Sequence, residues 1–206
     1  MSFELWLTFA MASAALLAIP GPTVMLVVSY ALGRGKASGW ATVPGVMLGD
    51  FTAMTASLLG AGVVLATSAE LFTLLKLIGA AYLIWLGIRL WRAEPPRDSV
   101  TTVHTRESRA GMFANAYIVT ALNPKGIVFF VAFLPQFIDH TKPVLQQFVI
   151  LEATFLGLAG ANILVWVLLI GRMRSTFNRP ETVRIVNRAG GSLLIGACLL
   201  TASLRH

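Results

Sequence analysis

Charged residues are scarce in this 206-residue chain: they make up 12% of it, about half the share found in a typical soluble domain. Hydrophobic residues account for 56%, and the stretch 5–33 contains no charged residue at all. A helix of ~20 apolar residues is long enough to cross a bilayer. The composition therefore excludes an ordinary soluble domain and indicates one integral membrane domain, residues 1–206.

Cysteine is almost absent as well, because Cys198 is the one cysteine in the sequence. A single cysteine excludes an internal disulfide and a CxxC redox pair. The sequence also shows no His/Cys metal motif, no nucleotide-binding loop and no nucleophile triad, so we expect no cofactor, no metal and no enzyme activity. The net charge of +7 does not indicate nucleic-acid binding, because the basic residues lie at the ends of apolar runs, as they do in membrane proteins.

The hydrophobic residues form six runs, each long enough to span a membrane as a helix. The runs are continuous, without the alternation that strands of a membrane barrel show. The sequence therefore predicts an all-α polytopic membrane protein with six transmembrane helices, at 3–31, 39–67, 71–90, 110–138, 144–170 and 185–204.

The polar, proline-containing linker 93–109 divides the chain into two halves of three predicted helices, 1–92 and 110–206. Twelve of the sixteen basic residues fall in or beside the first, third and fifth loops, so we expect these loops to be cytoplasmic and both termini to lie outside. The two halves would then form inverted repeats. One spacing supports this weakly: Pro22 precedes Asp50 by 28 residues, and Pro124 precedes Glu152 by the same number.

Prolines interrupt the predicted first and fourth helices. Proline removes a backbone donor and clashes with the preceding turn, so a helix must break or kink there. In lipid, freed backbone groups are tolerated only where protein or a water-filled cavity satisfies them. We therefore predict that both breaks border a polar substrate pathway, with the binding residues Pro20, Gly21, Pro22 and Thr23 in the first half and Asn123, Pro124 and Lys125 in the second.

Ionisable residues within the apolar runs are the other candidates for function, because a charge in lipid is costly. Helical rise places Asp50 and Lys125 near mid-membrane. Asp50 is suited to hold an ammonium group or a proton, and Lys125 beside a half-helix N-terminus is suited to a carboxylate. The alternative is that the two form a structural ion pair. Glu152 either lines an outer vestibule or pairs with a neighbour.

Gly45 and Gly49 form a G-x-x-x-G pattern just before Asp50. Such glycines let two helices approach closely. Packing within the chain is one interpretation of this pattern, and contact between two copies in a homodimer is the other.

Several motifs in a fixed order resemble those of the LysE/RhtB family of bacterial amino-acid exporters, over nearly the whole chain. They comprise Pro20-Gly21-Pro22, the basic turn 34–39, residues 45–50 and 71–83, Asn123-Pro124-Lys125, and the phenylalanine-rich stretch 129–137. Thr23 departs from the pattern, because an Asn or Asp usually follows Pro-Gly-Pro, and this leaves the identity of the substrate open.

The resemblance implies a secondary exporter in the bacterial inner membrane that carries small amino acids or their derivatives by alternating access. It also implies coupling to protons by antiport, so the expected partners are the amino acid, protons and lipid. Efflux of a metal or another small cation is the alternative, since distant relatives of similar architecture have that role. A cation carrier would need several carboxylate or soft ligands, of which the spans offer few.

Overall fold

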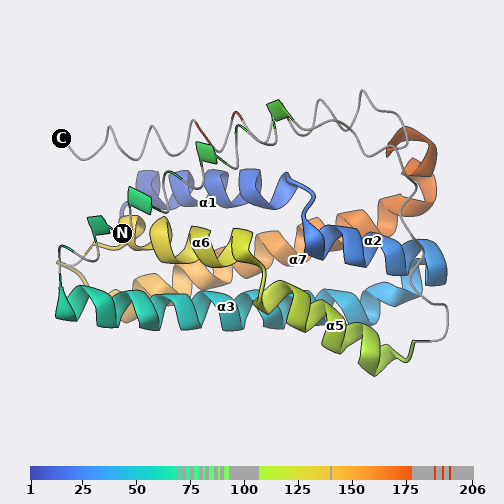
Figure 1. Ribbon diagram of the computed structural model, residues 1–206, viewed down its shortest axis with the longest axis horizontal. Helices are drawn as coiled ribbons and strands as arrows, with labels where there is room; N and C mark the ends of the chain where they lie inside the picture. Colours follow the sequence, from blue (N-terminus) through green and yellow to red (C-terminus); the bar gives the residue numbers. More distant parts are fainter. Residues whose placement is uncertain are drawn as a thin grey trace.

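A computed structural model describes residues 1–68, 107–139 and 141–177 continuously, together with single positions between 70 and 92 and between 188 and 195. Over these residues the protein consists of helices and short connections, without a strand (Figure 1). The predicted all-α fold is confirmed for this part of the chain.

The first predicted span is broken, as its prolines predict. Helix α1 covers Phe3–Ala18, and the side chain of Ser2 caps its N-terminus by accepting a hydrogen bond from the N–H of Leu5. Helix α2 covers Pro22–Arg34, with a proline at its first position. Proline is favoured there because the missing N–H would have no partner in any case. The chain bends by 54° at this break.

The chain then reverses through a short 3₁₀ turn, η1, at Gly35–Ser38. Gly35 has a positive φ of 72°, a conformation that side-chain-bearing residues rarely adopt. Helix α3 covers Gly39–Thr67, the same bounds as the predicted second span, and runs back along the length of the bundle (Figure 1).

The predicted fourth span is broken in the same way. It consists of α5 at Arg109–Ala121, α6 at Pro124–Ala132 and the 3₁₀ turn η2 at Leu134–Phe137. The side chain of Asn123 caps α6 by accepting from the N–H of Lys125 at 3.1 Å, and the chain bends by 44°. Helix α7 then covers Val144–Phe177 without interruption.

In the described residues, one unbroken helical segment, Val144–Leu169, is long and apolar enough to cross a membrane, and up to three spans result if each bent pair counts as one. The predicted third and sixth spans are described only at scattered positions, and most of the linker lies outside the described residues. The six-helix inverted repeat therefore stays a prediction.

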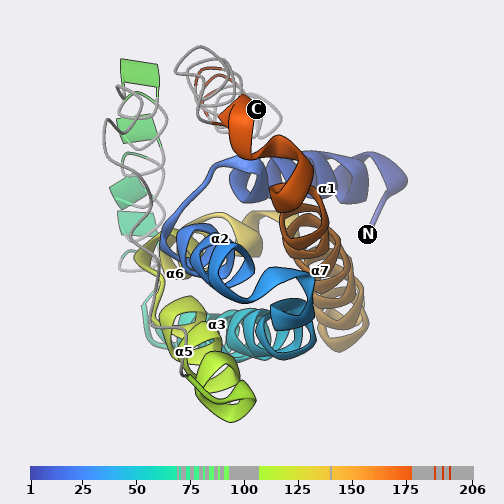
Figure 2. The same cartoon turned by 90° about the vertical axis from the view of Figure 1, so that its right-hand side faces the viewer.

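Helices α3 and α5 approach each other more closely than side chains would allow. A Cβ atom added at Gly45 would lie 2.6 Å from the carbonyl oxygen of Phe113, and one at Gly49 would lie 2.7 Å from the Cβ of Thr120. The G-x-x-x-G pattern thus serves packing within the chain, and it faces α5 rather than a second copy (Figure 2). A homodimer through other surfaces stays a prediction.

Six buried phenylalanines fill the interior between α1, α6, η2 and α7, with contacting ring centroids 4.8 to 6.3 Å apart. We call them the phenylalanine cluster: Phe9, Phe129, Phe130, Phe133, Phe137 and Phe155. The cluster lies on the side of the two breaks that faces the N-terminus of α1, away from Arg34.

Candidate functional site

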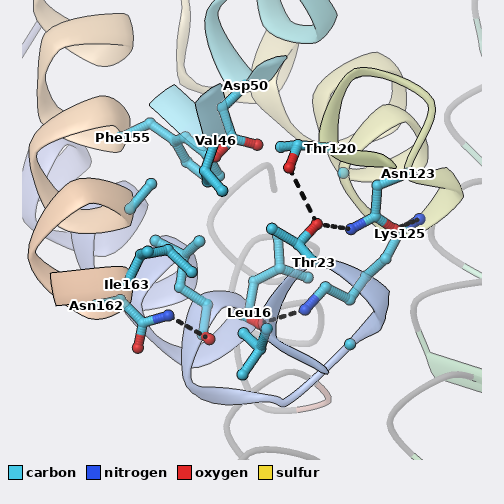
Figure 3. Close-up of a pocket in the computed structure, with 15 residues that line it drawn as sticks. Leu16, Thr23, Val46, Asp50, Thr120, Asn123, Lys125, Phe155, Asn162 and Ile163 are labelled. Atoms are coloured by element: carbon cyan, nitrogen blue, oxygen red, sulfur yellow. Dashed lines mark hydrogen bonds between the residues drawn. The ribbon is translucent and has the colours of Figure 1, made fainter. Parts of the chain in front are cut away.

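A small pocket lies between the two helix breaks. Its polar lining comes from both halves of the chain: Thr23 and Asp50 from the first, and Thr120, Asn123, Lys125 and Asn162 from the second (Figure 3). The rest of the lining is mainly apolar and includes Val46, Phe155 and Ile163. The cavity volume is about 30 Å³, which is room for two or three water molecules at ~10–15 Å³ each.

The carbonyl groups at the end of α1 are satisfied by side chains from the second half. The last carbonyls of a helix have no partner within it, and α1 has no basic residue in its last turn. The Nζ of Lys125 donates to the carbonyl oxygens of Leu16 and Ile19, at 3.0 and 2.9 Å. The amide of Asn162 donates to the carbonyl of Leu17 at 3.1 Å. The second half thus stabilises the break in the first.

Thr23 joins the two breaks directly. Its hydroxyl accepts hydrogen bonds from the Thr120 hydroxyl and from the Asn123 side-chain amide, both at 3.3 Å. These bonds connect residues about 100 positions apart in the sequence. They confirm that the two breaks lie against each other. Since both acceptor positions of the Thr23 hydroxyl are used, its own O–H is the donor that it has left.

Residues at the starts of both half-helices bring backbone donors to the pocket lining. Among the described residues, the N–H groups of Thr23 and Val24 in α2 and of Gly126 in α6 have no acceptor. All three residues line the pocket. Unpaired N–H groups at a helix N-terminus attract an anion, because the helix dipole adds to the hydrogen bonds.

Asp50 brings a carboxylate into the pocket from α3. It is buried, with 8% of its surface exposed, and it accepts no hydrogen bond from the described residues. Lys125 acts on it electrostatically, but the two make no direct ion pair among these residues. The structural-pair interpretation of Asp50 and Lys125 is therefore wrong as a description of direct contact.

Other predicted site residues lie outside the lining. Pro20, Pro22 and Pro124 shape the breaks without facing the cavity. Glu152 accepts a hydrogen bond from the hydroxyl of Thr55 at 2.7 Å, between α7 and α3. Of its two interpretations, pairing with a neighbour is the one that the structure shows.

Two polar pocket residues, Thr120 and Asn162, were not predicted. The signal available for them is that both are hydrogen-bonding side chains within long apolar runs, where such groups need partners. Neither is charged nor adjacent to a proline, so neither stood out from the other Thr and Asn residues of the spans.

Comparison with known proteins places the chain in a family. The LysE type translocator family matches residues 14–203. The chain is 34% identical to the homoserine/homoserine lactone efflux protein of Salmonella typhimurium over the full length of both. It is 31% identical to an uncharacterised membrane protein of Vibrio cholerae, again over both full lengths.

The leucine efflux protein of Salmonella choleraesuis is 27% identical, over 96% of this chain and 94% of its own. No solved structure matches the chain significantly. The family match covers nearly the whole sequence, including both breaks and every residue of the pocket. The chain belongs to the LysE-type translocator family.

Proposed function

We propose that the protein is a secondary exporter that carries small amino acids or their derivatives across the bacterial inner membrane in exchange for protons. The proposal draws on the family and on relatives named as efflux proteins for homoserine, homoserine lactone and leucine. The pocket between the two breaks is the proposed substrate site.

The observation that carries this proposal is Asp50. A buried carboxylate with neither a hydrogen bond nor a direct ion pair among the described residues is costly in a membrane protein, and such a residue is by default functional. Its proposed role is to hold the substrate's ammonium group and, on the return step, a proton. Only one of the two can neutralise the carboxylate at a time, and this exclusion couples their opposite movements.

The carboxylate of the substrate has donors on the other side of the pocket. The unpaired N–H groups of Thr23, Val24 and Gly126 and the O–H of Thr23 supply directed hydrogen bonds. Lys125 uses two of its three N–H groups on α1 and contributes positive charge nearby. An amino acid would therefore lie with its ammonium toward α3 and its carboxylate toward the starts of α2 and α6.

The small cavity supports transport by alternating access. About 30 Å³ does not admit a whole amino acid, so the lining helices must separate for loading and release. The phenylalanine cluster seals one side of the pocket, and Val27, Ala31 and other apolar residues pack on the side toward Arg34. Among the described residues, apolar side chains therefore lie between the pocket and each end of the bundle.

Cation efflux has no observation in its favour. Among the residues that the structure describes, no three side chains of His, Cys, Asp or Glu lie together where they could hold a metal ion. Amino-acid export is therefore the one function that we propose.

Replacing Asp50 by Asn tests the proposal. The change keeps the shape of the side chain and removes its charge, so we expect an inserted, folded protein with export reduced at least tenfold. The measurement is efflux of radiolabelled homoserine, homoserine lactone and leucine from preloaded proteoliposomes, with and without a proton gradient.

The matched control is Glu4→Gln, the same kind of change at an exposed position in the first turn of α1. We expect it to export normally. Export by Asp50→Asn at the wild-type rate, with the wild-type response to the proton gradient, would remove Asp50 from the mechanism. Failure of the wild-type protein to move any of the three compounds would refute their assignment as substrates.

A further inference from the structure

A second polar cluster joins α2 to α5, apart from the pocket. The hydroxyl of Tyr30 donates a hydrogen bond to the carboxylate of Glu107. The side-chain amide of Asn115 donates to the Tyr30 hydroxyl at 3.0 Å and to Glu107 Oε1 at 2.6 Å. Tyr30 is 2% exposed, whereas Glu107 and Asn115 are half-buried, so the cluster extends from the interior toward the surface. We call these three residues the Tyr30 cluster.

The cluster lies on the path from the pocket to the Arg34 end of the bundle. Tyr30 follows Thr23 by two turns of α2, about 10 Å at 1.5 Å per residue. Asn115 precedes Thr120 by five residues of α5, in the same direction along the bundle. Helices α2 and α5 are therefore joined by hydrogen bonds twice, once at the pocket and once at the Tyr30 cluster.

Between these two connections the same helices carry fully buried apolar residues. Val27 of α2 and Ala116 of α5 are both 0% exposed and belong to one hydrophobic cluster. No ion or amino acid passes such a layer while α2 and α5 remain together. Parting of these two helices would break this layer on the Arg34 side of the pocket.

The sequence before α5 is built to hold Glu107 in place. The hydroxyl of Ser108 caps α5 by accepting from the N–H of Gly111 at 3.1 Å. A Cβ atom added at Gly111 would lie 2.9 Å from the Cγ of Glu107, so the glycine leaves the space that the glutamate side chain occupies. Glu107 is thereby directed back over the first turn of α5, toward Tyr30.

We propose that the Tyr30 cluster is the latch that closes the substrate pocket toward the Arg34 end, with Tyr30, Asn115 and Glu107 as positioning residues for transport. Helix α5 is fixed to α3 by the close approach at Gly45 and Gly49. It is held to α2 by side-chain hydrogen bonds and by the apolar contacts around Val27 and Ala116, and the hydrogen bonds can break and re-form individually. This proposal depends on one part of the proposed function, namely transport by alternating access, because that mechanism needs a closure on each side of the pocket.

The test measures access to the pocket rather than transport. Cys198 is replaced by Ser, and Ala159, a small residue that lines the pocket, is replaced by Cys as a reporter. A membrane-impermeant maleimide is added to vesicles that expose the Arg34 end. Tyr30→Phe removes the hydroxyl that both partners bind, and we expect the reporter to react at least threefold faster than in the parent.

Tyr117→Phe is the matched control. It makes the same change on α5, two residues from Asn115, at a hydroxyl with no hydrogen bond among the described residues. We expect it to react like the parent. Glu107→Gln keeps the shape of the side chain and removes its charge, and it should accelerate the labelling reaction as Tyr30→Phe does. It is the test variant to use if Tyr30→Phe fails to insert into the membrane.

Unchanged reaction rates in Tyr30→Phe and Glu107→Gln would overturn the latch, and so would equal acceleration in Tyr117→Phe. The outcome does not depend on which compound is carried. Faster labelling in a protein that fails to export amino acids would support the latch and refute the proposed substrate. Normal export of amino acids with unchanged labelling would support the proposed substrate and overturn the latch.

Discussion

Lys125 both lines the pocket and supports the broken first helix. Its ammonium group bonds two carbonyl oxygens at the end of α1, and its backbone N–H is bonded by the Asn123 side chain. A buried carbonyl that loses its donor costs about 1–3 kcal/mol. Lys125 therefore contributes to the stability of the fold as well as to the charge of the pocket.

We predict that Lys125→Met lowers the melting temperature of the purified protein by several degrees. Methionine fills the same space but leaves the carbonyl of Ile19 without its donor, and it leaves the carbonyl of Leu16 with only the 3.3 Å bond from the N–H of Ile19. Lys142→Met is the control. Lys142 forms an exposed ion pair with Asp139 at 3.3 Å, and such pairs contribute about 0–1 kcal/mol. Melting in detergent measures both. Equal shifts in the two variants would show that Lys125 does not support α1.

At this scale the sequence singled out the two ionisable residues that line the pocket, but not their partners. Asp50 and Lys125 stand out because a charge within an apolar run is costly, whatever surrounds it. The contact of Lys125 with Leu16 and Ile19 spans more than a hundred residues and depends on how α6 packs on α1. No spacing in the sequence encodes that packing.

Helices α3 and α5 approach each other more closely than any other pair of helices that meets at a described glycine. Gly49 lies where a side chain would meet both the Cβ of Thr120 and, at 2.8 Å, the carbonyl oxygen of Tyr117. Asp50 and Thr120 lie next to this contact and both line the pocket. The spacing of α3 and α5 therefore sets the spacing of two pocket walls.

Gly49→Ala should destabilise the protein by about 1–3 kcal/mol, because the added methyl group forces α3 away from α5. Gly60→Ala, on the same helix, is the control: outside its own helix backbone, no atom of the described residues lies within 4 Å of its added Cβ. Replacing a mid-helix glycine by alanine there should stabilise the protein by roughly 0.5–1 kcal/mol. Thermal melting distinguishes the two, and a stability change of the same sign in both would contradict the close contact.

The helices themselves were the most predictable level of structure. Four of the predicted apolar runs correspond to described helices: the first to α1 and α2, the second to α3, the fourth to α5 and α6, and the fifth to α7. The prolines correctly predicted the positions of both breaks. These features depend on local chemistry, because proline lacks an N–H wherever it stands. The side-chain caps at Ser2, Ser108 and Asn123 are local too, because each accepts from an N–H two or three residues later in the chain. Neither these caps nor the small 3₁₀ turn η2 was predicted from the sequence.

For the whole molecule, the described residues place the basic turn after α2 and the start of α5 at one end of the bundle, and the loop between η2 and α7 at the other (Figure 1). Twelve basic residues belong to the first, third and fifth loops, against Lys142 and Arg205 on the opposite side. The end that contains Arg34 should therefore face the cytoplasm.

Cysteine labelling of intact cells tests this orientation. In a Cys198→Ser background, we expect Thr141→Cys to react with an impermeant reagent and Ser99→Cys to react only after the membrane is opened. Thr141 is exposed in the loop before α7, and Ser99 lies in the predicted linker. The reverse pattern would invert the assigned topology.

The support of α1 by Lys125 and Asn162 also has a consequence for biogenesis. The carbonyls of Leu16, Leu17 and Ile19 emerge early in synthesis, whereas Asn162 is made roughly 140 residues later. At ~5–20 residues per second, this delay is on the order of ten to thirty seconds. During that time the carbonyls of Leu17 and Ile19 would lack the donors that they have in the folded protein, and the carbonyl of Leu16 would keep only its bond from the N–H of Ile19. The insertion machinery, or water held within it, must shelter these groups until the second half arrives.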